Sequence, residues 1–390
     1  MDITKQFYYR EQPTEILFGY EVLDRLGERI NQLNAKRVLL VTDKGIVNSG
    51  GASRVTAILK ESKIDVILFS ETHEDPGTHI VEKAREVANI KGCDVILGLG
   101  GGSCIDTAKA VAILMNNSGK LTDYAGMDKV PSQSSKPAVI AIPSTAGTGS
   151  EVTMDAVLTD DETGDKFFIA SSNICASVAL VDPELTLTLP PSLTAATGMD
   201  ALTHAIESFT NMITQPISQS IAYTSIQLIA RSLRNAVKHG NDRKARCNMS
   251  LASLMAGMAF TVARLGLCHA IYLPLGSKPY KIAHGLANGI MLPHVMRFNA
   301  PANPCAYRKV AEALGIDCSK LSDLEASLKS ADEVASLAKD IGMERKLSEF
   351  GITEKDLPQI ARGAFRSGGI KINPRHVREE DIIEICKNAL

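Results

Sequence analysis

The chain has 390 residues, of which 45% are hydrophobic and 22% charged, and its formal net charge is −2. This length predicts two domains, and a near-neutral charge without basic runs argues against nucleic acid as a partner. No apolar run is long enough to predict a membrane span or a signal peptide. Eight scattered cysteines without a Cys-x-x-Cys pair favour reduced thiols and a cytoplasmic location over disulfides or a zinc–thiolate site.

The first half of the chain alternates strand and helix patterns. Short apolar runs predict buried parallel strands at 37–43, 65–70, 94–100, 138–143 and 178–183. Helical spacing of apolar residues separates them at 79–92 and 105–117. This alternation predicts an α/β domain with a doubly wound, mostly parallel sheet, whose ligand binds at the carboxyl ends of the strands.

A glycine-rich loop follows the predicted strand 94–100. In GLGGGSCIDTAK (98–109), Gly100, Gly101 and Gly102 permit close backbone approach, and Ser103 opens a helix whose N-terminus would face an anion such as a pyrophosphate. Ser103 occupies the place of the third glycine of the Rossmann fingerprint, so a simple tight turn is an equal alternative. A second loop, PSTAGTGSEVT (143–153), follows the next strand on the same edge, and two such loops favour a nucleotide.

Asp43 ends the predicted strand 37–43. A carboxylate in this position can accept hydrogen bonds from the ribose of a dinucleotide. A helix cap or turn is an equally good interpretation of the same residue. The sequence leaves both alternatives open.

The second half of the chain is expected to be helical. Strand patterns stop after the proline pair 190–191, and helical spacing dominates from there onward. We therefore predict an α/β domain over residues 1–190 and an all-α domain over residues 191–390.

Four residues of the second half form a candidate metal site. Asp200 and His204 are four residues apart, on one face of a predicted helix, and His269 and His284 lie in apolar, glycine-flanked segments. Any one of these histidines alone is more easily explained as a hydrogen-bonded core residue. Together, one carboxylate and three imidazoles suit Fe²⁺, Zn²⁺ or a neighbouring transition metal. A nucleotide and such a metal suggest hydride transfer to or from an alcohol or aldehyde.

Several longer motifs are more specific: GGGSCIDTAKA, PSTAGTGSEVT, LPPSLTAATGMDALTHAIES and HGLANGIMLPHVMRFN. With them the chain resembles the iron-containing (group III) alcohol dehydrogenases over nearly its whole length. The resemblance implies NAD(P)-dependent interconversion of alcohols with aldehydes or ketones. It also implies a dinucleotide-binding domain, a helical metal domain and a homo-oligomer (dimer or higher), with Fe²⁺ the first choice of metal and Zn²⁺ the second.

The resemblance assigns roles to individual residues. Asp200, His204, His269 and His284 match the metal ligands. Gly100, Gly101, Gly102 and Ser103 match the pyrophosphate loop, Asp43 the ribose contact, and Ser144, Thr145 and Thr148 the second nucleotide loop, and Asp106 and Lys166 complete the predicted cofactor-binding set. NAD(H) is the expected cofactor. The alternative is a non-redox lyase similar to dehydroquinate synthase, which uses nucleotide and metal on the same architecture.

Two departures from the family pattern bear on the substrate. Leu273 stands where many members have a further histidine, and the segment between His269 and His284 is one residue longer than usual. Arg264 and Lys278 flank the third ligand. Solvent-exposed cations are the default interpretation of both, and the other is recognition of an anionic tail on a short aldehyde.

Overall fold

The computed structural model describes residues 13–132 and 137–390. These residues divide into two compact units, one ending at Thr188 and the other running Leu189–Leu390. Among the described helices, no single one is long and apolar enough to span a membrane; the bent pair Arg243–Ala263 and Leu267–Gly276 meets that test by length and composition.

The first unit contains a six-stranded parallel sheet in the order β1-β9-β6-β4-β2-β3. Its strands are β1 (Glu15–Phe18), β2 (Arg37–Asp43), β3 (Asp65–Thr72), β4 (Val95–Gly100), β6 (Ala138–Pro143) and β9 (Val178–Val181). Its α-helices are α1 (Leu26–Gln32), α2 (Lys44–Asn48), α3 (Gly51–Glu61), α4 (Thr78–Lys91) and α5 (Gly102–Asn116). The predicted α/β fold with its parallel sheet is confirmed.

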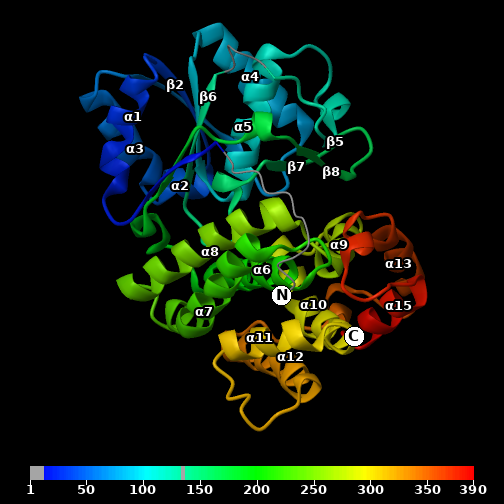
Figure 1. The fold of residues 1–390 in the computed structure, drawn as a ribbon. Coiled ribbons are helices and arrows are strands. Elements are labelled where there is room, and N and C mark those ends of the chain that lie inside the picture. Colours follow the sequence, from blue (N-terminus) through cyan, green and yellow to red (C-terminus); the bar gives the residue numbers. More distant parts are fainter. Residues whose placement is uncertain (1–12, 133–136) are drawn as a thin grey trace. The chain divides into compact units, whose positions relative to one another are not determined.

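Both faces of this sheet are buried, as expected for apolar strands that lack a polar alternation. Leu39 and Val41 of β2 pack with residues of α4 and α5. Val38 and Leu40, which point the other way, pack with residues of α1 and α3. Figure 1 accordingly shows α1 and α3 on one side of β2 and β6, and α4 and α5 on the other.

The strand order reverses between β2 and β4. From β2 the chain first adds β3 on one side and then returns to place β4, β6 and β9 successively on the other side. Connections on the two sides of such a point leave in opposite directions and open a crevice at the strand ends, where ligands of doubly wound sheets bind. Asp43 ends β2 and Gly100 ends β4, so both lie at this point.

A second, three-stranded sheet belongs to the same unit and is not predicted from the sequence. It has the order β5-β8-β7 and consists of β5 (Gly126–Met127), β7 (Asp155–Thr159) and β8 (Lys166–Ala170). Lys109 of α5 fixes the chain entering this sheet, because its ammonium donates to the carbonyls of Ser150 (2.7 Å), Thr153 (2.9 Å) and Asp155 (2.8 Å). Burial of this ammonium lowers the pKa of Lys109.

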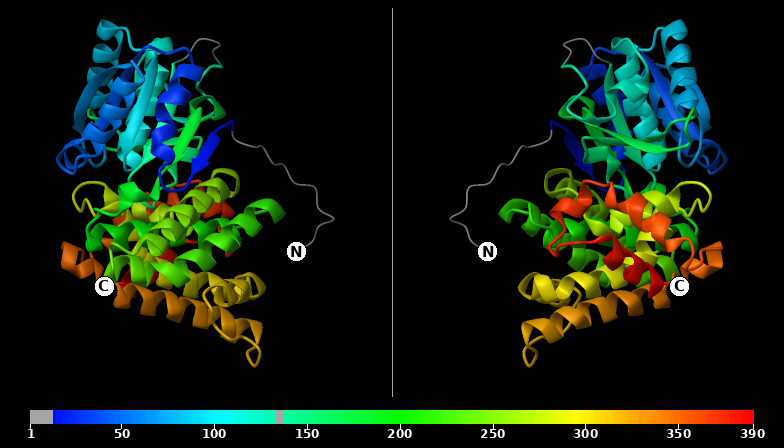
Figure 2. Two further views of the ribbon diagram at one scale, coloured as in Figure 1. Left: turned by 90° about the vertical axis from the view of Figure 1, so that its left-hand side faces the viewer. Right: turned by 90° about the vertical axis from the view of Figure 1, so that its right-hand side faces the viewer.

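The second unit is helical from Leu189 onward, as predicted. Its helices are α6 (Pro191–Thr210), α7 (Pro216–Lys238), α8 (Arg243–Ala263), α9 (Leu267–Gly276), α10 (His284–Asn299), α11 (Pro304–Ala313), α12 (Asp323–Asp340), α13 (Leu357–Phe365), α14 (Gly369–Ile372) and α15 (Glu379–Lys387). Helix α6 lies at the centre of this unit, and every residue from Gly198 to Thr210 is buried. Figure 2 shows α11 and α12 running side by side along one edge of the unit.

Candidate metal centre and nucleotide-binding loops

The structure brings the four predicted metal ligands together. Asp200 and His204 lie one turn apart on α6, His269 lies in the first turn of α9, and His284 is the first residue of α10. One ligand atom from each residue can be chosen so that all four lie within 4.8 Å of one another. Metal–ligand bonds of about 2.0–2.2 Å place two ligand atoms of the same ion at most about 4.4 Å apart. The four side chains therefore need to move together only slightly to bind a divalent ion.

Asp200 is the centre of this cluster. Its Oδ1 lies 2.9 Å from Nδ1 of His284, 3.8 Å from Nε2 of His204 and 3.9 Å from Nε2 of His269. Burial alone would raise the pKa of Asp200, but the charges of the three histidines and the hydrogen bond from His284 hold it well below its usual range. Asp200 is therefore a carboxylate at neutral pH, the form that binds a metal ion.

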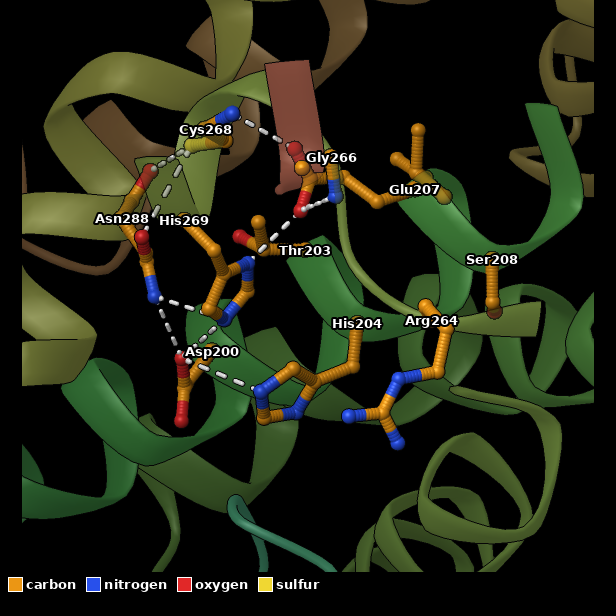
Figure 3. Close-up of polar contacts among 12 residues, drawn as sticks. Asp200, Thr203, His204, Glu207, Ser208, Arg264, Gly266, Cys268, His269 and Asn288 are labelled. Atoms are coloured by element: carbon orange, nitrogen blue, oxygen red, sulfur yellow. Dashed lines mark hydrogen bonds and ion pairs between the residues drawn. The ribbon is translucent and has the colours of Figure 1, made fainter. Parts of the chain in front are cut away.

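Two further residues support the ligands and were not among the predicted site residues. Glu207, on α6, accepts a hydrogen bond from Nδ1 of His269 (2.7 Å) through its Oε2. Asn288, on α10, donates through Nδ2 to Oδ1 of Asp200 (2.9 Å), and the same amide nitrogen lies 3.1 Å from Nε2 of His269 (Figure 3). Glu207 lies one turn beyond His204, and Asn288 lies one turn beyond His284. This helical spacing is the only sequence feature that could have indicated that they face the ligands.

The bond between Glu207 and His269 sets the tautomer of the imidazole. A carboxylate only accepts, so Nδ1 of His269 carries the proton and Nε2 keeps its lone pair on the side of Asp200. Metal-binding histidines commonly have such a carboxylate partner on their other nitrogen. The donor set, its burial and this support fit a divalent transition metal.

Glu207 is itself fixed by backbone hydrogen bonds. Its two carboxylate oxygens accept from the amides of Gly266 (3.0 Å) and Cys268 (2.6 Å), at the start of α9. Cys268 is fully buried and packs at this junction, and burial raises the pKa of its thiol well above the ordinary value. The segment that carries His269 is thus held to α6 at three points.

The predicted nucleotide loops also come together, at the carboxyl ends of β4 and β6. Gly101 caps α5 without offering a side-chain acceptor, so the first turn of this helix presents backbone N–H groups and the positive end of its dipole. Gly100 has φ +148°, and a Cβ there would lie 2.6 Å from the sulfur of Cys104; a Cβ on Gly102 would lie 2.8 Å from Cγ2 of Thr148. A side chain at either position would therefore require its neighbour to shift.

Ser144, Thr145 and Thr148 lie in the loop after β6, beside the glycines. The amide of Ser144 donates to the carbonyl of Gly100 (2.8 Å), and Cγ2 of Thr145 would be 3.6 Å from a Cβ on Gly101. Ser103 occupies the second position of α5. The glycine loop and the serine–threonine loop therefore form one continuous surface at the sheet edge.

Asp43 caps helix α2, so the alternative interpretation of this residue as a helix cap is confirmed. Its Oδ1 accepts from the amide of Ile46 at 2.9 Å, and its Oδ2 lies 3.4 Å from the thiol of Cys104. Capping occupies one carboxylate oxygen, and the other lies toward Gly100. The ribose contact stays a prediction.

Asp106 and Lys166 have other partners in the structure. Asp106 accepts from the hydroxyl of Ser150 (2.5 Å) and from the amide of Val157 (3.0 Å), which joins α5 to the second nucleotide loop and to β7. Lys166, on β8, forms an ion pair of 2.6 Å with Asp75. A direct contact of either residue with a cofactor stays a prediction, and their observed contacts position neighbouring segments.

The two departures from the family pattern, Leu273 and the longer segment between His269 and His284, do not disturb the cluster of candidate ligands. Leu273 lies one turn after His269 on α9 and is partly exposed. The chain between α9 and α10 turns back on itself through hydrogen bonds from Lys281 to Ser277 and from Ile282 to Leu275, and His284 still reaches Asp200. The longer loop therefore leaves His284 beside the other three candidate ligands.

The chain was compared with protein families and with known proteins. The family profile described as iron-containing alcohol dehydrogenase matches residues 13–183, and the profile of the C-terminal part of that family matches residues 194–390. The 1,3-propanediol dehydrogenase of Citrobacter freundii is 40% identical over 379 residues, which covers 97% of each chain.

Solved structures give the same result. A crystal structure of 1,3-propanediol oxidoreductase superposes with a TM-score of 0.96 at 39% identity and covers 99% of this chain and 100% of its own. Sulfoacetaldehyde reductase from Bifidobacterium kashiwanohense, solved in complex with NAD⁺, gives a TM-score of 0.89 at 31% identity and covers 99% of both chains. These likenesses define the class of protein, an oxidoreductase of alcohols and aldehydes. The chain belongs to the iron-containing alcohol dehydrogenase family.

Proposed function

We propose that this protein is an NAD(H)-dependent and metal-dependent enzyme that interconverts a short-chain alcohol and its aldehyde. The observation that carries the proposal is the largely buried cluster of Asp200, His204, His269 and His284. Within it, Glu207 fixes the tautomer of His269. A purely structural polar cluster has no need of four converging ligand atoms.

The metal is proposed to be Fe²⁺, with Zn²⁺ as the alternative, because both accept a ligand set of three imidazoles and one carboxylate. When bound, such an ion polarises the oxygen of the alcohol or aldehyde. The contribution of the chain is to hold four ligands in fixed positions. Asn288 orients Asp200, and Glu207 orients His269.

The cofactor is proposed to be NAD(H). The N-terminus of α5 and the glycines before it suit the pyrophosphate. The Oδ2 atom of Asp43, which accepts from the thiol of Cys104 and not from the helix it caps, suits the adenosine ribose. The complex of sulfoacetaldehyde reductase with NAD⁺ supports this assignment by likeness. A 2′-phosphate would meet the charge of Asp43, which disfavours NADP(H).

The reaction balances with these partners alone. In the reductive direction, bound NADH would supply the hydride, with its two electrons, to the carbonyl carbon. The carbonyl oxygen would take one proton from solvent, so that one aldehyde and one NADH give one alcohol and one NAD⁺. Leu273 offers no proton, and no side-chain base is required at the carbon.

The non-redox lyase alternative is not favoured by the relatives, which are named as dehydrogenases and reductases. Stoichiometry separates the two. The proposed enzyme consumes one NADH for each aldehyde reduced, whereas a lyase of the dehydroquinate synthase kind gives no net oxidation of the nucleotide.

The proposal is tested by a panel of short alcohols and aldehydes on protein reconstituted separately with Fe²⁺ and Zn²⁺. His269→Ala and His284→Ala should lose the metal and turnover, and should bind NADH as the wild type does, because the nucleotide loops belong to the other unit. Metal content is measured by atomic emission and NADH binding by fluorescence. Full metal content in either variant would remove that residue from the ligand set.

Two broader expectations accompany the proposal. The protein is expected to form a homo-oligomer, which light scattering of the purified chain can test. A cytoplasmic location is inferred from its scattered cysteines, all eight of which are free thiols in the structure.

A further inference from the structure

His284 is the candidate ligand with the greatest access to solvent. Its side chain is 34% exposed, whereas those of the other three ligands are between 3% and 11% exposed. It is also the first residue of α10, so no turn of that helix precedes it. The position of its imidazole therefore depends on contacts with neighbouring side chains.

Two of the contacts of His284 are with residues outside the ligand set. Nδ2 of Asn288 lies 3.4 Å from its Nε2, and the ring of Tyr272 lies against its imidazole. The two ring centroids are 4.3 Å apart and the ring planes meet at 81°, an edge-to-face arrangement of the kind that aromatic pairs favour. Tyr272 lies three residues after His269 on α9, so one turn of this helix supplies both a ligand and this contact.

The ring of Tyr272 also lies against the end of α9. A Cβ on Gly276 would lie 2.4 Å from Cε2 and 2.6 Å from Cζ of this ring. Side chains four residues apart share a helix face, so a larger residue at position 276 would have to displace the ring. Tyr272 itself is buried, and a buried ring in contact with Gly276 and His284 has little freedom to turn.

The turn between α9 and α10 brings His284 to this ring. The amide of Ile282 donates to the carbonyl of Leu275 at 3.0 Å, which folds the chain back along the end of α9. The side chain of Ile282 is buried, which fixes the turn two residues before His284. The contact between Tyr272 and His284 therefore depends on the packing of two helices and their connecting turn.

We propose that Tyr272 is a positioning residue, which holds the imidazole of His284 toward Asp200 and slows the release of the metal on the solvent side of the site. The inference rests on the proposed function, because it concerns the metal of the same site. Local opening of a protein begins where burial is least, and in this cluster that place is His284. Rotation of its imidazole away from Asp200 would open the site to solvent, and the ring of Tyr272 opposes that rotation.

The other three ligands are fixed without this ring. Asp200 and His204 belong to the buried part of α6, and Glu207 orients His269 through a hydrogen bond of 2.7 Å. The contribution of Tyr272 is therefore expected at one ligand, His284, and in measurements of the metal rather than of the fold alone.

The experiment compares wild type with Tyr272→Leu, Tyr272→Phe and the control Tyr223→Leu. Tyr223 lies on α7, and its ring pairs with that of Phe209 on α6 at a centroid distance of 6.1 Å. Its replacement removes a ring of the same size from an aromatic pair that contains no candidate ligand. Each protein is prepared free of metal and titrated with Zn²⁺ and with Co²⁺ in competition with a chelator of known affinity.

Tyr272→Leu should raise the dissociation constant of the metal about 3- to 10-fold, which is the range expected for the loss of one aromatic pair. Release of the ion to excess chelator should become faster by a similar factor. The visible d–d absorption of the Co²⁺ protein, which depends on coordination geometry, should change as well. Tyr272→Phe keeps the ring and should keep the affinity, the release rate and the spectrum of the wild type. Tyr223→Leu should lower the Tm and leave all three unchanged.

A second substitution tests the same contact without removing the ring. Gly276→Ala places a methyl group where the ring of Tyr272 now lies, so it should displace the ring from His284 and raise the metal dissociation constant. In the Tyr272→Leu background the ring is absent, and Gly276→Ala should have no further effect. Additive effects of the two substitutions would overturn the claim that both act through this ring contact.

The outcomes separate the two proposals. A wild-type protein that binds no divalent ion would overturn the metal site of the proposed function. Metal binding by the wild type, with an unchanged dissociation constant, release rate and spectrum in Tyr272→Leu, would overturn only the role of Tyr272. That role is also overturned if Tyr272→Phe loses as much affinity as Tyr272→Leu, or if Tyr223→Leu weakens metal binding to the same extent.

Discussion

Replacement of Glu207 by glutamine separates metal affinity from fold stability. The carboxylate accepts three hydrogen bonds, from the amides of Gly266 and Cys268 and from Nδ1 of His269. Glutamine has one acceptor oxygen, which can replace the oxygen shared by Gly266 and His269. The amide group then faces the N–H of Cys268, donor against donor, and the charge assistance to His269 is lost.

The structure sets the size of the effect. Loss of one charge-assisted hydrogen bond in a buried site lowers the free energy of unfolding by about 1.5–3 kcal/mol. For a domain of this size that corresponds to a Tm lower by about 3–12 °C. Removal of a partner that orients a metal-binding histidine weakens metal affinity about 10- to 100-fold.

Two assays measure these quantities separately. Thermal unfolding of the metal-free protein reports the structural contribution, and competition with a chelator of known affinity reports the dissociation constant of the metal. Glu354→Gln is the matched control, because Glu354 is an exposed carboxylate 3.6 Å from Lys387 and such surface pairs contribute less than about 1 kcal/mol. A lowered Tm with unchanged metal affinity would show that Glu207 stabilises α9 without orienting His269 as a ligand, and the reasoning would fail.

Three further predictions concern the nucleotide-binding unit. Gly102→Ala should weaken NADH binding and lower the Tm, because its Cβ would lie 2.8 Å from Cγ2 of Thr148. Adding Thr148→Ser, which deletes that methyl group, should restore part of the binding and part of the Tm. If neither recovers, this contact is not the cause. Asp43→Gly should reduce the preference for NADH over NADPH in kcat/KM, and comparable efficiency of the wild type with both would refute the ribose assignment. Burial raises the pKa of Glu151 to about 7 from 4.5, so the unfolded chain ionises first and stability is lost as pH rises through this window. Glu151→Gln should therefore stabilise the protein by roughly 3 kcal/mol at pH 8 and by little at pH 4.5 in urea unfolding, and an equal effect at both values would exclude this titration.

The buried parallel sheet was predictable because its strands carry a local signal. The run 37–43 is apolar on both faces, and such runs occur where helices cover both sides of a parallel sheet. The strands β7 and β8 gave no such signal. Val157 and Phe168 lie opposite each other and are exposed, so one face of this short sheet is not buried. The polar residues beside these strands are typical of a loop, and the sequence therefore did not indicate strands here.

The metal ligands were predictable and their supporting residues were not. Asp200 and His204 share a helix face, and imidazoles in apolar segments are informative by themselves. The role of Glu207 depends on the packing of α9 against α6. These helices are far apart in the sequence, so their contact could not be predicted from it. Its position one turn after His204 is also compatible with an ordinary surface carboxylate. The role of Asn288 was equally unpredictable, because it depends on the contact of its side-chain amide with Asp200, which the sequence does not show.

Asp43 illustrates a different limit. The sequence allowed a cap or a ribose contact. The structure shows the cap, in which one oxygen accepts from the amide of Ile46, and the ribose contact stays a prediction.

The distribution of the ligands over α6, α9 and α10 has a consequence for folding. An ion bound there would join α6 to α9 and α10, which follow only after α7 and α8. It would therefore act as a cross-link that restricts the unfolded chain only while it stays bound. His284 is the first residue of α10, and loss of the ion would release this helix start first. Removal of the metal should therefore increase amide exchange and proteolysis around residues 277–284 in addition to abolishing turnover. Cleavage of this segment in the cell would then distinguish metal-free from metal-loaded protein.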